Sequence, residues 1–164
     1  MKKIYKEIYE ELNLEDLKTN EKRAIELARG YIGKQTNIWH INSPKKVSTA
    51  LYVERLDKFF LGQNIGISKV TGTLCAERAA IANMVSNFPY IELNDLKVLA
   101  IVSEKNPILP CGVCCEWLYK MNPDMILLTL NEKSTKVIKI LLRDYYGDER
   151  LLINRRVMVD DYSY

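Results

Sequence analysis

The sequence lacks the features that would place it at once among membrane-bound or secreted proteins. No apolar run approaches the roughly 18 residues that a membrane-spanning helix requires. Residues 1–7 include three lysines, but no apolar stretch follows them, so we expect no secretory signal and a cytoplasmic location. The net charge of +3 permits a phosphate-bearing partner but is too small to indicate binding to nucleic acid.

The chain has one histidine and four cysteines, which limits the kinds of metal site that it can build. His40 is the only histidine, and we assign it no role because it lies outside every motif described below. Four cysteines in an intracellular chain favour metal binding or catalysis over disulfides. The 164 residues suit one domain with a real core, since 48% apolar and 27% charged residues are the proportions of a globular protein.

Hydrophobic spacing predicts one main domain preceded by a short extension. Ile4, Ile8 and Leu12 recur at helical spacing, so residues 1–18 are predicted to form an N-terminal helical extension. Residues 19–164 contain no linker, repeat or low-complexity tract and are predicted to form a single catalytic domain.

Within this domain, strand and helix patterns alternate after an initial helix and a hairpin. Helices are predicted at 21–32, 75–87 and 111–121, a hairpin at 47–54 and 59–65, buried strands at 98–102 and 125–130, and a short strand followed by a helix at 137–146. Residues 151–164 are unassigned. This order predicts an α/β fold, a three-layer α/β/α sandwich around a mixed, five-stranded sheet.

Two short motifs carry the cysteines that matter for chemistry. Cys75 and Glu77 belong to a C-x-E segment, and Cys111 and Cys114 belong to a P-C-x-x-C segment. Three thiolates make an incomplete tetrahedral zinc site, and a catalytic zinc keeps its fourth position open for water. Glu77 stands where a proton carrier for that water is needed. Both motifs are predicted to open a helix, where partial positive charge favours the thiolate form.

Two other interpretations of the cysteines compete with this one. A closed structural zinc site would use all four, but the adjacent Cys114 and Cys115 would then have to bind one small ion from one helix. Unrelated core cysteines are the second, and a C-x-x-C pair alone is weak evidence against them. The additional Cys75 and Glu77, at the spacing that the chemistry needs, make coincidence a poor explanation.

Three segments together resemble the cytidine deaminases of the three-cysteine, homotetrameric type. Residues 73–81 are similar to the C-A-E-R-x-A-I segment of that family, and residues 110–114 to its P-C-G-x-C segment. Residues 60–65 resemble its F-x-G-x-N-[VI] stretch. The likeness spreads over residues 21–147 and leaves 1–18 as an extension.

The resemblance implies a role for each matched residue of the reaction centre. Cys75, Cys111 and Cys114 would bind one Zn²⁺, and Glu77 would move protons from water to the ring N3 and to the departing amine. Zinc with three thiolates carries a net negative charge and is a poor activator of water. Arg78 would donate hydrogen bonds to the sulfurs and restore the Lewis acidity of the metal.

The resemblance also implies contacts to a nucleoside and an oligomeric state. The backbone N–H of Ala76 would hold the pyrimidine 2-oxygen, the backbone of Pro110 would contact the substrate, and Asn64 would contact a sugar hydroxyl. The family forms homo-oligomers, so we expect a tetramer or a dimer, with a small nucleoside as the substrate and no membrane partner.

Departures from the family pattern lie on the sugar side and leave the substrate open. Gly66 stands where the family has a ribose-binding glutamate, and Lys45 aligns with an aromatic residue that stacks on the base. Cytidine, deoxycytidine, a modified analogue and an aminoacylated nucleoside of the blasticidin S type all fit, since blasticidin S deaminase also lacks that glutamate. A nucleotide fits as well, if Lys45 and Lys46 hold its phosphate.

Two interpretations from other classes of protein compete with a nucleoside deaminase. A nucleic-acid-editing deaminase would need a basic groove with stacking aromatics, for which Arg150, Arg155 and Arg156 with nearby tyrosines are a modest basis. A zinc-stabilised interaction module without activity is the other. Such a module has no use for Glu77 and Arg78 beside the thiols.

Overall fold

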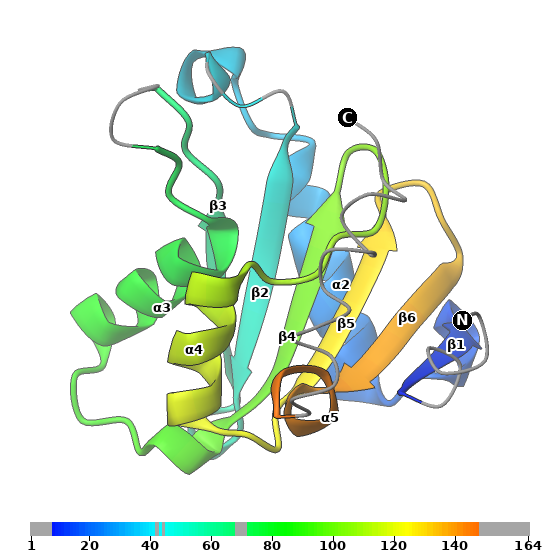
Figure 1. Cartoon of the computed structure of the whole chain (residues 1–164), viewed down its shortest axis with the longest axis vertical. Helices are drawn as coiled ribbons and strands as arrows, with labels where there is room; N and C mark the ends of the chain where they lie inside the picture. The colour runs from blue at the N-terminus through cyan, green and yellow to red at the C-terminus, as the bar shows by residue number, and fades with distance from the viewer. Residues whose placement is uncertain (1–7, 42, 44, 68–71, 148–164) are drawn as a thin grey trace.

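A computed structural model describes residues 8–41, 43, 45–67 and 72–147 of the chain (Figure 1). Six strands of this part form one sheet in the order β1-β6-β5-β4-β2-β3. They are β1 (Tyr9–Asn13), β2 (Val47–Val53), β3 (Lys58–Gln63), β4 (Leu96–Ser103), β5 (Ile126–Asn131) and β6 (Lys136–Leu141). Only β4 and β5 pair in parallel, and the other four pairings are antiparallel. The sheet is therefore mixed, as predicted, but has one strand more than the expected five.

Helices cover both faces of this sheet and complete the predicted three-layer sandwich. Helix α2 (Thr19–Ile32) lies behind the sheet in Figure 1, whereas α3 (Ala76–Asn87), α4 (Gly112–Met121) and the short α5 (Leu142–Tyr146) lie in front of it. A separate apolar core fills each of the two interfaces. No helix in the described ranges is long and apolar enough to cross a membrane.

Strand β2 holds a helix against each face because its side chains alternate in direction. Every residue from Val47 to Val53 is buried. The hydroxyl of Ser48 donates to the carbonyl of Ala28 in α2, and the hydroxyl of Thr49 donates to the carbonyl of Ala76, 2.9 Å away, at the start of α3. The second bond fixes the start of α3 over the centre of the sheet.

Gly62 of β3 lets helix α3 approach the sheet closely. It is paired with Thr49 across the hairpin. A Cβ atom at this position would lie 2.2 Å from the carbonyl oxygen of Ala76 and 2.4 Å from the backbone nitrogen of Ala80. Both are backbone atoms that cannot rotate away, so only glycine fits here. Thr49 and Gly62 together position the first turn of α3 on the sheet.

The N-terminal prediction is wrong where the structure describes it. Tyr9–Asn13 form strand β1, which pairs with β6 through registers such as Tyr9 with Ile140, and a 3₁₀ turn at Leu14–Asp16 follows. The exposed edge of β6 offers unpaired backbone groups, and pairing with them outweighs a local helical pattern. Residues 1–7 and the arginines proposed for nucleic-acid binding lie outside the described residues.

The other elements follow the sequence patterns to within a few residues. Helix α2 begins two residues before the predicted start, because Glu21 rather than Asn20 satisfies its first turn. The carboxylate of Glu21 accepts the backbone N–H of Lys18 at 3.1 Å and the ammonium of Lys139 at 2.8 Å. The pattern at residues 137–146 fits both a strand and a helix. The structure has β6 followed by α5 there, as expected.

Candidate active site

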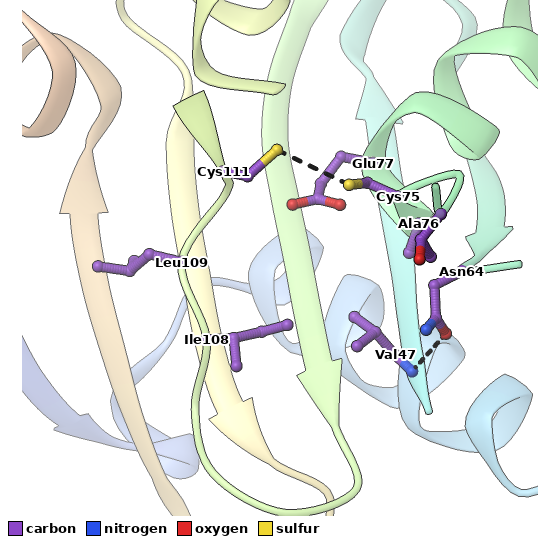
Figure 2. A pocket seen from close by; sticks show the side chains of 9 residues that line it. Val47, Asn64, Cys75, Ala76, Glu77, Ile108, Leu109 and Cys111 are labelled. Atoms are coloured by element: carbon purple, nitrogen blue, oxygen red, sulfur yellow. Dashed lines mark hydrogen bonds between the residues drawn. The ribbon is translucent and has the colours of Figure 1, made fainter. Parts of the chain in front are cut away.

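The two cysteine motifs meet where helices α3 and α4 begin. Cys75 is the residue immediately before α3, Cys111 is the residue immediately before α4, and Cys114 lies buried in the first turn of α4. The sulfurs of Cys75 and Cys111 are 3.7 Å apart, and all three sulfurs lie within 4.8 Å of one another (Figure 2). The structure thus brings Cys75 to Cys111, 36 residues further along the chain, and to the neighbouring Cys114.

The spacing of these sulfurs matches the requirements of a tetrahedral metal. A Zn–S distance of about 2.3 Å in a tetrahedral site separates the sulfurs by about 3.8 Å. The pKa of Cys111 lies well below its ordinary value because the neighbouring thiols of Cys114 and Cys75 and the backbone N–H groups of Cys114 and Val113 donate to its sulfur, whereas the pKa values of Cys75 and Cys114 are raised because their thiols donate to Cys111. The three thiols therefore fit one Zn²⁺.

Cys115 does not join this cluster. Its side chain is buried and points elsewhere, since its sulfur donates to the carbonyl of Pro110 at 3.3 Å. Adjacent residues on a helix project in different directions, which explains why Cys114 reaches the other thiols and Cys115 does not. A closed site made of all four cysteines does not fit this geometry.

Glu77 lies beside the thiols on the second residue of α3, with only 4% of its surface exposed. In Figure 2 its carboxylate lies next to the sulfurs of Cys75 and Cys111. Burial raises the pKa of Glu77 to about 7, and the charge of Cys111 adds to the rise. A carboxyl group with a pKa near neutrality can both accept and return a proton at physiological pH.

Arg78 reaches the same cluster from the next position of α3. Its guanidinium donates to the sulfur of Cys75 at 3.8 Å and to the backbone carbonyl of Thr73 at 3.3 Å. The second bond holds the side chain toward the thiols instead of leaving it in solvent. This is the placement that the charge argument expects of an arginine beside three thiolates.

A pocket of about 150 Å³ opens beside the cluster (Figure 2). Its lining residues are Val47, Asn64, Thr73, Cys75, Ala76, Glu77, Ile108, Leu109 and Cys111. A cavity of about 150 Å³ holds one six-membered ring. The pocket is therefore large enough for a pyrimidine base next to the thiols.

The predicted substrate residues divide into two that line this pocket and two that do not. Asn64 and Ala76 are lining residues, whereas Pro110 and Lys45 are not among them. Ile108 and Leu109 take part instead, and sequence reasoning missed both. Their apolar character directly before the P-C-G-V-C motif was the available signal, since it marks a buried approach to the second pair of thiols.

Asn64 is buried and held by three hydrogen bonds within the chain. Its oxygen accepts the backbone N–H of Val47 at 2.8 Å, and its amide nitrogen donates to the hydroxyl of Ser43 at 2.9 Å and to the carbonyl of Lys45 at 2.8 Å. The side chain therefore fastens Ser43, Lys45 and Val47 to the end of β3.

Gly66 continues the same close packing. A Cβ atom there would lie 2.5 Å from the Cβ of Ser43, and its backbone N–H donates to the carbonyl of Trp39 at 2.7 Å. Lys46 donates from its ammonium to the carbonyl of Gln35 at 3.1 Å. Ser43 thus occupies the place where a side chain at position 66 would stand.

Comparison with known proteins agrees with the site. A family model described as the cytidine and deoxycytidylate deaminase zinc-binding region matches residues 34–129. The cytidine deaminase of Mycoplasma pneumoniae is 32% identical over 96 residues, which cover 57% of this chain and 71% of that protein.

Solved structures share the fold. The cytidine deaminase of Burkholderia pseudomallei superposes with a TM-score of 0.65 at 24% identity, over 78% of this chain and 95% of that one. The enzyme of Bacillus anthracis gives 0.58 at 18% identity, over 89% of this chain and 100% of that one. Since the family model covers more than half of the sequence, the chain belongs to the cytidine and deoxycytidylate deaminase family and is a hydrolytic deaminase.

Proposed function

We propose that this protein is a zinc-dependent deaminase that converts a cytosine-type nucleoside, such as cytidine, deoxycytidine or a modified analogue, to its uracil form and releases ammonia. The observation that carries the proposal is the meeting of three thiols and one buried carboxyl group at a pocket of ring size. Membership of the deaminase family supports the reaction type.

We propose that Cys75, Cys111 and Cys114 hold one Zn²⁺ per subunit. When bound, the metal supplies a Lewis acid that makes water nucleophilic at neutral pH. Glu77 would accept the two protons of the attacking water in turn and deliver one to the ring N3 and the other to the amino group at C4. The new C4–O bond forms, the C4–N bond breaks, and ammonia leaves.

Arg78 is proposed to tune the charge of the site. Three thiolates leave a zinc site with one excess negative charge, which weakens it as a Lewis acid. The hydrogen bond from Arg78 to the sulfur of Cys75 withdraws part of that charge.

Contacts to the substrate are proposed at the start of α3 and along the pocket wall. The backbone N–H of Ala76 lies in the first turn of α3, where no carbonyl of the helix can accept it, and it is proposed to hold the pyrimidine 2-oxygen. The oxygen of Asn64 keeps one lone pair for a sugar hydroxyl. A backbone contact from Pro110 and a phosphate contact from Lys45 stay as proposals.

A homo-oligomer, either a tetramer or a dimer, is also proposed. The exposed apolar side chains Val113 and Trp117 lie one turn apart on α4 and give this helix a face that another copy could cover. Elution from a sizing column at the mass of a monomer in dilute buffer would count against it.

The function is tested by ammonia release from the purified, zinc-loaded protein. Cytidine, deoxycytidine, their monophosphates and an aminoacylated cytosine nucleoside form the panel. We expect release from at least one, and its loss in Glu77→Gln. Absence of release from the whole panel, or equal release by the variant, would contradict the proposal.

A further inference from the structure

The loop between β4 and α4, residues 104–111, contributes part of the pocket wall and leads into the second cysteine motif. Ile108 and Leu109 of this loop line the pocket, three and two residues before Cys111. In Figure 2 the side chain of Ile108 extends toward Val47, whereas that of Leu109 is directed the other way. Ile108 is therefore the loop residue whose side chain faces the space proposed for the base.

Thr129 of β5 lies next to this loop, with only 1% of its surface exposed. It pairs with Ile101 of β4 and with Ile138 of β6, in a strand whose other buried residues are leucines. Burial of a hydroxyl group costs free energy unless the group is hydrogen-bonded, and a valine would fill the same space without that cost. The hydroxyl at this position therefore points to a role that packing alone does not require.

The hydroxyl of Thr129 forms two hydrogen bonds with the backbone of Ile108. It donates to the carbonyl of Ile108 at 2.6 Å and accepts the backbone N–H of Ile108 at 3.1 Å. A hydroxyl group has one donor and two acceptor positions, so this one side chain satisfies both backbone groups. Ile108 is thus held at its main chain, and the direction of its side chain is fixed with it.

Other residues fasten the two ends of the loop. At the first end, the carbonyl of Glu104 accepts the side-chain amide of Asn131 at 3.2 Å. At the second end, the sulfur of Cys115 donates to the carbonyl of Pro110 at 3.3 Å. Thr129 acts between these two points, so loss of its hydroxyl should release the middle of the loop and leave the start of α4 in place.

We infer that Thr129 is a positioning residue for the deamination, because its hydroxyl holds Ile108 so that the apolar wall beside the base has one shape before the substrate binds. The inference rests on the proposed function. Without the hydroxyl, the backbone groups of Ile108 can find partners in water, since the neighbouring Lys105 and Asn106 are exposed. The substrate would then bind only the fraction of molecules whose wall is in place, which raises the apparent dissociation constant in proportion.

The expected result of removing the hydroxyl is a rise in KM with little change in kcat. Each neutral hydrogen bond lost corresponds to a factor of roughly 2 to 13 in an equilibrium constant. Thr129→Val removes both bonds and keeps the shape of the side chain, so KM should rise by about tenfold for each nucleoside of the panel that releases ammonia. In the bound state the wall is in place, so kcat should stay within about twofold of the wild-type value.

Two further variants separate positioning from general stability. Thr129→Ser keeps the hydroxyl and should bring KM to within about twofold of the wild-type value. Ser48→Ala is the matched control, because it removes another fully buried hydroxyl, which bonds to Ala28 on the opposite face of the sheet. It should lower the melting temperature and leave KM unchanged.

Three results of this comparison would overturn the inference. The first is a KM for Thr129→Val within about twofold of the wild-type value, which is less than one neutral hydrogen bond accounts for. The second is a KM for Thr129→Ser as high as that for Thr129→Val. The third is an equal rise of KM in Ser48→Ala, which would trace the effect to stability.

Amide hydrogen exchange of the zinc-loaded protein, measured without any nucleoside, tests the contact itself. In the wild type, the backbone N–H of Ile108 should exchange more slowly than those of Lys105 and Asn106, and Thr129→Val should remove this difference. Fast exchange at Ile108 in the wild type would overturn the inference even if Thr129→Val does not fold. Absence of ammonia release from a wild-type protein with slow exchange at Ile108 would instead contradict the proposed function, so the two failures are distinguishable.

Discussion

The two ends of the pocket are built in different ways. At the reaction end, Cys75, Glu77 and Cys111 come from the starts of two helices and turn their functional atoms toward one point. At the end away from the thiols, Asn64 hydrogen-bonds to Ser43 and Lys45, and Gly66 packs closely against Ser43. The first end directs reactive side chains toward a ligand, whereas at the second end the side chains pack against and bond to the chain itself. Substitutions beside the thiols should therefore abolish the reaction, whereas substitutions at Asn64 or Gly66 should disturb the local structure.

The largest effect is expected when a thiol is removed from the reaction end. Cys114→Ser should abolish zinc retention after dialysis against a chelator and with it the deaminase activity, because two remaining thiols cannot hold the metal in the same geometry. Zinc content by metal analysis and ammonia release are the measurements.

Cys115→Ser is the matched control for this change. Its hydroxyl can still donate to the carbonyl of Pro110, so zinc content should stay at one per subunit. Loss of zinc from Cys115→Ser would instead support the closed structural zinc site made of all four cysteines.

The next largest effect concerns the proton carrier. Glu77→Gln keeps the shape of a buried side chain but removes the group that accepts and returns protons, so kcat should fall by about 10²- to 10⁴-fold while zinc content is unchanged. Glu116→Gln on α4 is the control, because Glu116 is exposed and pairs with Lys120 in solvent. Equal activity of both variants would remove Glu77 from the mechanism.

A smaller loss is expected from Arg78, which acts on the thiols and not on the substrate. Arg78→Gln should lower activity or zinc affinity by about 10- to 100-fold, the usual range for a group that hydrogen-bonds a metal ligand. Competition with a chromogenic zinc chelator measures the affinity. An unchanged affinity together with unchanged kcat would mean that the contact with Cys75 has no influence on the metal.

The smallest effect on the chemistry is expected at Gly66, which is not one of the residues that line the pocket. Gly66→Ala forces Ser43 to move, at a cost of about 1–3 kcal/mol in the free energy of unfolding. It should also make the backbone at Trp39 and Ser43 more sensitive to proteolysis, with kcat/KM changed only a few-fold.

Gly30→Ala is the control for steric effects, since no atom lies within 4 Å of a Cβ there. Thermal melts and limited proteolysis compare the two variants. If the Gly66→Ala protein has the same melting temperature and protease resistance as the Gly30→Ala protein, the close contact between Gly66 and Ser43 does not stabilise this part of the chain as described.

Local patterns predict the reaction end well because each of its parts is local. A C-A-E-R segment that opens a helix places Glu77 and Arg78 by helix geometry alone, and Cys111 and Cys114 lie on one face by the same rule. The pairing of the two helix starts was the only long-range step, and the chemistry of zinc suggested it. The structure has confirmed the helices at both motifs and the cluster of three thiols.

Long-range contacts explain what the sequence could not reveal. Tyr9–Asn13 become a strand because β6 has a free edge, which no pattern within those five residues records. The sugar contact predicted for Asn64 stays a proposal, but the sequence did not reveal that its side chain also hydrogen-bonds to groups 17 to 21 residues away in the chain. Such contacts depend on how segments meet, so they appear only in three dimensions.

The contacts of Thr49 and Gly62 with the start of helix α3 link the folding of the hairpin to the metal site. Thr49 and Gly62 face each other across β2 and β3, and both touch Ala76, the neighbour of the first thiol. A hairpin that forms one or two residues out of step would set a residue with a side chain (Phe60, Leu61, Gln63 or Asn64) opposite Thr49. The helix could not settle on such a hairpin, and Cys75 would stand too far from its partners. Zinc loading is therefore a direct report of correct strand pairing, and the metal content of a preparation should measure the fraction of molecules whose hairpin has closed in step.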